Sequence, residues 1–369
     1  KADVVNVANK YFNDSYIDFV KKYGSYPKDK VSKPNFKPIV PKNTNAESEY
    51  AKQLEQIPLK EMAPRLTDYN RDVETKALTK YATLYVKKNP VNNLFSFSLI
   101  YHKGTLSDPK LSALESYLSD IGTDSLTKHE FGQAMQQIGT TFETSAEKNS
   151  FSITLSGIDS NLAASLQLLR HFMDYAKADK KSMKSLASTY QVNDRSFIKD
   201  AGNIADAITE KVAFGDKSSY INHLSTSDIK KMNGEELIAL FKELQKNECS
   251  IVYSGQLSAS DVENAVNDYM PIGQASLPAS IVYRPMRTIE KPTVYIFDMP
   301  TDRQTKIRTY QAVNPCATDG EKAKLKIWGS YFGGGFSSLL FQEIREFRSY
   351  AYHAYGYDQQ PPIMFTADR

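Results

Sequence analysis

The sequence predicts an α+β protein in which helices pack on one face of a sheet. Residues 94–101 and 151–156 alternate apolar with polar side chains, as strands with one buried face do. Residues 162–173 instead space their apolar side chains along one stripe of a helix. The positions that carry these patterns are Phe95, Phe97, Leu99, Phe151, Ile153, Leu155, Leu162, Leu166 and Leu169.

Length, charge and cysteine spacing exclude several classes of protein. A chain of 369 residues with 41% hydrophobic residues has room for two modules and connecting segments. The 46 basic residues nearly balance the 43 acidic ones and are spread along the chain, which predicts no nucleic-acid partner. No apolar run approaches the ~18 residues of a membrane span. The two cysteines lack the CxxC spacing of a zinc knuckle or a thioredoxin-type motif.

The first 71 residues read as the end of one module followed by a linker. Residues 1–25 show a helical face from Asp3 to Phe12 and a short apolar strand from Tyr16 to Val20, so we expect them to close a preceding module. Residues 26–71 are expected to form an extended linker, because proline fixes φ and removes a hydrogen-bond donor. Six of the sixteen prolines fall there, at Pro27, Pro34, Pro38, Pro41, Pro58 and Pro64.

The remainder is predicted to contain a complete module and a partial one. Residues 72–275 form the first, which ends with a strand at 249–255 and a helix at 261–269. Residues 276–292 are a connection with three prolines, and residues 293–369 are a truncated final module. That final module is expected to hold strands at 294–297, 309–313 and 350–357, a helix from about Glu321, and a second helix over 336–347.

Two metal or nucleotide motifs are incomplete. The five histidines are scattered, and His129-Glu130 is no HExxH zinc motif because Gln133 occupies the second histidine position. Gly333-Gly334-Gly335 precedes a helix, but Ser338 replaces the third glycine of a GxGxxG loop and no Walker lysine follows. The alternative for the triple glycine is close approach of another segment.

Arg345 and Tyr352 are ambiguous when their neighbours alone are considered. Arg345 lies on the polar side of the helical stripe at 336–347, where most charges are solvated. Tyr352 stands beside small residues in a segment of period two, which is compatible with a packed tyrosine or with a ligand contact.

The stretch from Tyr331 to Tyr352, YFGGGFSSLLFQEIREFRSYAY, closely resembles the C-terminal signature of the insulinase/pitrilysin-type (inverzincin) zinc peptidases. In that family the motif supplies an arginine and, seven positions later, a tyrosine, and both face the substrate. Arg345 and Tyr352 fall on these positions. Ser349-Tyr350 replaces the usual Gly-Leu, a departure that leaves the spacing intact.

The resemblance extends upstream, to a segment that lacks the zinc ligands. Residues 108–123 resemble the inverted HxxEH zinc helix of catalytic modules, with Ala113, Ser116 and Tyr117 where the first histidine, the base glutamate and the second histidine would stand. The third ligand, a glutamate some 75 residues later, has no acidic counterpart at 189–191. The resemblance therefore implies that residues 72–275 are a degenerate, zinc-less module.

The resemblance implies the C-terminal, non-catalytic half of a zinc metalloendopeptidase that encloses and cleaves peptides. Arg345 and Tyr352 would contact substrate and oxyanion, zinc would be bound outside this segment, and the segment alone would be inactive. The implied partners are a peptide substrate and the N-terminal zinc-bearing half, and a periplasmic or otherwise extracytoplasmic location is favoured. The alternative is a non-catalytic peptide-binding or structural homologue, and an intact HxxEH in the N-terminal half would distinguish the two.

Overall fold

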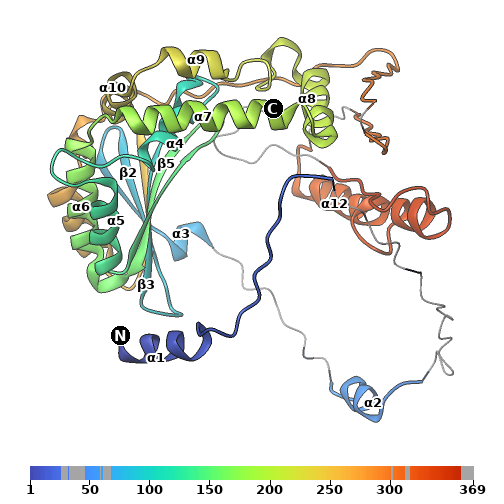
Figure 1. Cartoon of the computed structure of the whole chain (residues 1–369), viewed down its shortest axis with the longest axis horizontal. Helices are drawn as coiled ribbons and strands as arrows, with labels where there is room; N and C mark the ends of the chain where they lie inside the picture. Colours follow the sequence, from blue (N-terminus) through green and yellow to red (C-terminus); the bar gives the residue numbers. More distant parts are fainter. Residues whose placement is uncertain are drawn as a thin grey trace. The chain divides into compact units, whose positions relative to one another are not determined.

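The computed structural model describes residues 1–25, 32, 46–58, 60, 68–300, 302–311 and 316–358 (Figure 1). The chain divides into two units, residues 1–65 and residues 66–369. Most of the proline-rich segment predicted at 26–71 lies outside the described residues.

The described residues of the first unit form two short helices with no buried side chain. They are α1 (Ala2–Tyr11) and α2 (Glu49–Glu55). Ser48 caps α2 by accepting a hydrogen bond from the backbone N–H of Ala51 at 3.1 Å. The strand expected at 16–20 is wrong, because these residues are exposed and pair with no strand in the described part of the chain. A strand is stable only when it is paired, so an apolar run alone does not make one.

The second unit is built on one mixed six-stranded sheet, in the order β1-β2-β6-β3-β5-β4. Only β2 and β6 run parallel, and every other neighbouring pair is antiparallel. The strands are β1 (Glu74–Thr79), β2 (Ala82–Lys88), β3 (Leu94–Tyr101), β4 (Thr140–Ala146), β5 (Phe151–Ile158) and β6 (Cys249–Gly255). The predicted strands at 94–101, 151–156 and 249–255 are confirmed.

Only one face of this sheet is buried. Phe97 of β3, Leu155 of β5 and Tyr253 of β6 share a row on that face and are completely buried. The positions between them on the other face are mostly serine and threonine, for example Ser98 and Thr154, whose hydroxyls lie 3.0 Å apart. The alternation read from the sequence is therefore the alternation of the two faces, and the predicted α+β class with a mixed sheet is confirmed.

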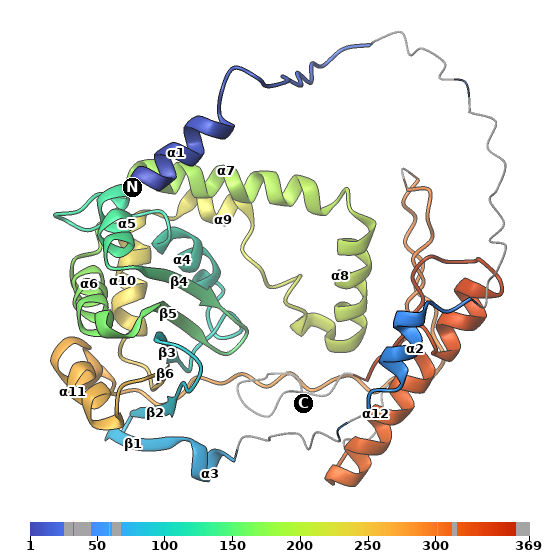
Figure 2. The same ribbon diagram turned by 90° about the horizontal axis from the view of Figure 1, so that it is seen from below.

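Helices cover the buried face of the sheet (Figure 1). Those that contribute to the core are α4 (Lys110–Leu118), α5 (Lys128–Gln137), α6 (Leu162–Tyr175), α7 (Lys180–Phe197), α9 (Thr226–Lys231), α10 (Gly234–Leu244) and α11 (Ala259–Tyr269). Helix α3 (Tyr69–Asp72) precedes β1, and α8 (Ala201–Phe214) follows α7 around a sharp corner (Figure 2). Leu166, Leu169 and Phe172 of α6 are completely buried, as the stripe at 162–173 predicts.

Residues 276–287 of the second unit, which we call the strap, form no helix or strand of their own. Hydrogen bonds hold them against other parts of the same unit. The backbone N–H of Ser280 donates to the carbonyl of His102 at 2.8 Å. The buried side chain of Asn149 both donates to and accepts from the backbone of Val282, at 3.1 and 2.8 Å. Hydrogen bonds to the backbone and side chains of the module thus fix the first part of the connection predicted at 276–292.

A buried ion pair fixes the end of the strap. Arg284 is 1% exposed, donates to Glu210 at 2.8 Å and to the carbonyl of Lys217 at 2.9 Å, and lies 4.2 Å from the ring centre of Phe214. Burial opposes ionisation of Glu210, but hydrogen bonds from Ser219 and Arg284 hold its pKa below the usual range. Each charge of the Arg284–Glu210 pair is therefore offset by the opposite charge of the other, as a buried charge requires.

The C-terminal part of the second unit contains α12 (Asp319–Gly333) and one turn of π-helix (Phe341–Glu346). The strands expected at 294–297 and 350–357 are wrong, because both segments lack pairing partners among the described residues and are largely exposed. The strand expected at 309–313 lies partly outside the described residues. No helix in the described ranges combines the length and the apolar character needed to cross a membrane.

Candidate functional site

Arg345 and Tyr352 are in direct contact. The guanidinium carbon of Arg345 lies 4.4 Å from the ring centre of Tyr352 and 4.6 Å from that of Phe341, four residues earlier on the π-helix. Two aromatic rings thus contact one guanidinium, an arrangement that cation–π attraction stabilises. The sequence motif did not single out Phe341, although the spacing of four residues from Arg345 is the signal that would have done so.

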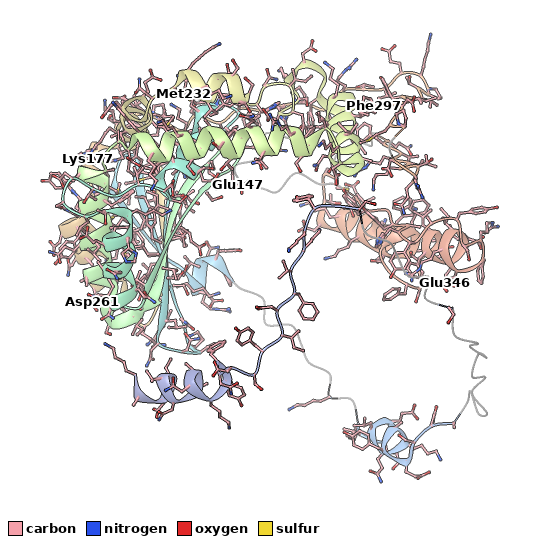
Figure 3. The ribbon with its side chains drawn as sticks, in the orientation of Figure 1. Glu147, Lys177, Met232, Asp261, Phe297 and Glu346 are labelled. Atoms are coloured by element: carbon pink, nitrogen blue, oxygen red, sulfur yellow. The ribbon has the colours of Figure 1, made fainter. Side chains whose placement is uncertain are left out.

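The two side chains differ in exposure. The side chain of Arg345 is 28% exposed, whereas Tyr352 is 71% exposed. Glu346, labelled in Figure 3, places a carboxylate oxygen 3.5 Å from Nε of Arg345. The phenol of Tyr352 is therefore available to a ligand, and the charge of Arg345 is only partly offset by its neighbour.

A left-handed turn brings Tyr352 back toward the helix. Ser349 has a φ of +52°, and its backbone N–H donates to the carbonyl of Arg345 at 3.0 Å. This is the position where the family motif has glycine, the residue that adopts positive φ without steric cost. Replacement of glycine by Ser349 thus keeps the turn but strains it.

A glycine contact supports the segment that carries Tyr352. A Cβ added to Gly333 would lie 2.1 Å from the backbone nitrogen of Gly356, and that nitrogen donates to the carbonyl of Gly333 at 3.2 Å. The first glycine of the triple glycine therefore permits close approach of two backbone segments. This close approach is the role that the sequence allowed for the triple glycine as the alternative to a phosphate-binding loop.

The residues predicted to stand at the zinc-ligand positions are not arranged as a site. Ala113 and Tyr117 are completely buried in the core, and only Ser116 is exposed. The phenol of Tyr117 accepts a hydrogen bond from the backbone N–H of Asp179 at 2.8 Å. The side chains of Ala113 and Tyr117 thus point into the module, and neither lines a solvent-accessible site.

The outward face of α4 carries Ser112, Glu115 and Ser116 instead. Tyr190 of α7 reaches this face, and its hydroxyl lies 3.2 Å from Oγ of Ser112. Burial raises the pKa of the Glu115 carboxyl, even though the backbone N–H of Ala146 donates to it. Glu115 is the single zinc-ligand type in this set, because neutral hydroxyls and a phenol do not bind zinc, so this donor set does not fit the metal.

His129 has an exposed side chain and Glu130 has a structural role. Glu130 accepts hydrogen bonds from the backbone and the hydroxyl of Thr127, which completes a capping box at the start of α5. These bonds lower the pKa of Glu130. Within the part of the chain that the structure describes, no three His, Cys, Asp or Glu side chains gather as a metal site.

Part of the chain matches a known protein family. Residues 231–364 match the family model described as the peptidase M16 inactive domain. No curated protein matches the chain.

Among solved structures, the peptidase M16 inactive domain from Pseudomonas fluorescens is similar with a TM-score of 0.59 at 16% identity, over 77% of this chain and 70% of that one. A protease from Helicobacter pylori is similar with a TM-score of 0.56 at 14% identity, over 78% and 71% of the two chains. A conserved protein from Enterococcus faecalis gives 0.57 at 14% identity, over 76% and 71%. At these identities the structures establish the fold, while the family model covers the motif with Arg345 and Tyr352. The resemblance to the insulinase/pitrilysin-type peptidases is therefore confirmed, and the part of this M16 family that the chain matches is the inactive domain.

Proposed function

We propose that this chain is the substrate-binding, zinc-less half of an M16-type metalloendopeptidase, in which Arg345 and Tyr352 contact the peptide. The observation that supports this most directly is their mutual contact, 4.4 Å from guanidinium carbon to ring centre, with the tyrosine side chain 71% exposed. Two functional groups with different hydrogen-bond geometry are thus held together at a solvent-accessible position.

The proposed roles follow from the donors that each side chain offers. The rings of Phe341 and Tyr352 contact the guanidinium of Arg345, so its in-plane N–H groups are the ones left for peptide carbonyls. The hydroxyl of Tyr352 is a single donor that can point at an oxygen on which charge develops. A donor used in this way lowers the barrier of the reaction more than it tightens binding of the substrate.

In the proposed enzyme zinc binds to the N-terminal half, because the side chains of α4 and α7 do not fit the metal. The present chain then contributes shape and hydrogen-bond donors and is inactive alone. A peptide substrate, the N-terminal half as partner and an extracytoplasmic location remain predictions from the family resemblance.

The test is Tyr352→Phe in the full-length protein, with Tyr355→Phe as the matched control. Tyr355 is also exposed, at 65%. Its ring stacks on the ring of Tyr357, with 6.1 Å between the ring centres, and not on Arg345. Loss of one transition-state hydrogen bond costs about 10²–10³-fold in kcat. We expect kcat to fall at least about tenfold in Tyr352→Phe, with the melting temperature unchanged, and to stay near normal in Tyr355→Phe.

Unchanged turnover in Tyr352→Phe would remove this residue from the mechanism. A full-length protein that binds peptides but cleaves none would instead favour the alternative, a non-catalytic peptide-binding homologue of the same family.

A further inference from the structure

His102 and Glu248 lie at the ends of neighbouring strands, outside the segment that carries Arg345 and Tyr352. His102 follows β3 and Glu248 precedes β6, and the backbone N–H of His102 donates to the carbonyl of Glu248 at 2.9 Å. The side chain of His102 is 9% exposed, whereas that of Glu248 is 37% exposed. The proposed peptide contacts make no use of this buried imidazole.

Three polar side chains form a line at this place. Nδ1 of His102 lies 3.4 Å from a carboxylate oxygen of Glu248, and Nε2 lies 2.9 Å from Oγ of Ser250. A carboxylate can only accept a hydrogen bond, so Nδ1 carries the proton of the neutral ring and Nε2 accepts from the hydroxyl. The order Ser–His–Glu is also that of a hydrolytic triad. Ser250 is only 6% exposed, however, so a substrate could not approach it and a structural role is favoured.

The strap is attached at the same two residues. The backbone N–H of Ser280 donates to the carbonyl of His102 at 2.8 Å. The backbone N–H of Ala279 donates to the second carboxylate oxygen of Glu248 at 3.2 Å. The backbone N–H of Glu248 in turn donates to the carbonyl of Leu277 at 2.8 Å. The imidazole–carboxylate pair and the start of the strap are therefore parts of one hydrogen-bonded arrangement.

The buried imidazole resists a second proton. Burial lowers the pKa of His102 below its ordinary value of 6.5, and the carboxylate of Glu248 offsets this only in part. A second proton would sit on Nε2, where the hydroxyl of Ser250 already donates. That hydroxyl would have to turn away and find another acceptor in a buried place.

Other titratable groups lie near the pair on the elements that surround it. Tyr101 and Cys249 belong to the core face, and burial raises the pKa of each. Lys103 is partly exposed, and Lys246 pairs with a carboxylate of α10. Residues 276–282 of the strap contain no titratable side chain. The carboxylate partner of the imidazole is thus the charged group that shifts its pKa.

We propose that His102 and Glu248 form a pH-dependent latch, which holds residues 276–282 of the strap while the imidazole is neutral and releases them in acid. The other end of the strap stays attached over the same range. Arg284 is always charged, and the pKa of Glu210 lies below its usual range, so their ion pair does not titrate. The latch is independent of the peptide contacts proposed above.

The direction of the effect follows from proton binding. When the strap opens, the imidazole meets water and takes up its second proton near the ordinary pKa of 6.5. In the closed state the pKa is lower, so the open state binds protons more readily. The stability that the neutral ring gives the closed strap is therefore present above pH 6.5 and is lost as the pH falls through the pKa of the closed state.

The experiment follows hydrogen exchange of the whole chain by mass spectrometry at about pH 7.5, 6.5 and 5.5, with each rate compared with the intrinsic rate at that pH. We expect the amides of Leu277, Ala279 and Ser280 to lose protection by about threefold or more between the highest and the lowest pH. The amides of Leu166 and Leu169 in the completely buried stripe of α6 should keep theirs, and they are the internal reference.

His102→Gln removes the titration and keeps a polar side chain. We expect the strap of this variant to keep the same protection at each pH. His171→Gln is the matched control, because Nε2 of His171 also lies near hydroxyls, at 2.9 Å from Ser125 and 3.1 Å from Thr123, but has its place on α6. It should show the same loss of protection in the strap as the parent.

Glu248→Gln tests the direction in a second way. The carbonyl oxygen of glutamine can still accept from the N–H of Ala279, while the negative charge that favours protonated His102 is gone. The closed state then binds the second proton still less readily. The loss of protection at the lowest pH should therefore be larger than in the parent.

A strap whose protection does not change with pH, or changes equally in His102→Gln, overturns the proposal. Equal losses in the strap and in α6 overturn it as well, because the whole module then opens together. If His102→Gln does not fold, Glu248→Gln decides, and a loss of protection no larger than that of the parent contradicts the latch.

Discussion

The sheet module and the C-terminal segment use their large side chains in opposite ways. In the module, Phe97, Tyr117 and Tyr253 are completely buried. In the segment that carries the peptidase motif, Trp328, Phe347 and Tyr352 are 51%, 71% and 71% exposed. The module is thus stabilised by its own core, whereas the C-terminal segment presents its aromatic residues outward.

The strongest test of this contrast is a pair of truncations. Phe97→Ala removes a completely buried ring and should cost about 3–5 kcal/mol of unfolding free energy. Phe347→Ala removes an exposed ring and should change it by no more than about 0.5 kcal/mol. Urea denaturation of both variants measures the difference, and similar losses would contradict the contrast.

Tyr117→Phe tests whether the residue at a predicted ligand position belongs to the core. The variant deletes the hydroxyl that accepts from the N–H of Asp179, the capping residue of α7. A buried donor left without its partner costs about 1–3 kcal/mol. Denaturation should show this loss in Tyr117→Phe and a smaller one in Tyr190→Phe, whose hydroxyl contacts the hydroxyl of Ser112 at 3.2 Å.

Ser349→Gly should act in the opposite direction. A non-glycine residue in the left-handed region costs roughly 1 kcal/mol, so the variant should gain about that much stability where the motif is folded. Ser349→Ala keeps the strain and is the control. Melting curves in which both variants behave alike would show that the turn is not under strain.

Glu115→Gln gives the smallest effect and a defined pH dependence. Because burial raises the pKa of Glu115 above 4.5, the protonated carboxyl favours the folded state. This contribution is present below the unfolded pKa and is lost as the pH rises through the folded pKa. The glutamine variant should therefore gain stability relative to the parent as the pH rises above about 4.5, the ordinary pKa of this carboxyl, by less than about 1 kcal/mol because the group is only half-buried. A difference that does not change with pH would show that the carboxyl is not perturbed.

Sequence patterns predicted the parts of the fold in which each residue's environment follows from its neighbours along the chain. The alternation at 94–101 gave β3, and the stripe at 162–173 gave α6. Apolar runs at 16–20 and 294–297 failed as strands because pairing partners are a tertiary property. The resemblance implied that Arg345 and Tyr352 face the substrate, but their mutual contact, the contact with Phe341 and the strained turn at Ser349 required the backbone path.

The positions of α4 that resemble a zinc helix show how far the resemblance reaches. It places Ala113, Ser116 and Tyr117 where the ligands and the base would stand, yet Ala113 and Tyr117 are completely buried. Leu111, Leu114 and Leu118 already mark a helical stripe, which places Ser112, Glu115 and Ser116 opposite the core. Helical periodicity was thus the better guide to which side chains of α4 face outward.

The strap determines where the module ends as a cooperative unit. The amide groups of Leu277, Ser280 and Arg287 all donate to carbonyls of the module, at 2.9, 2.8 and 2.7 Å. Amide protons held in this way exchange with solvent only when the structure around them opens. The strap should consequently exchange with the core rather than with the exposed residues that follow it, so the physical boundary of the folding unit lies after Arg287, beyond the change in composition near residue 275.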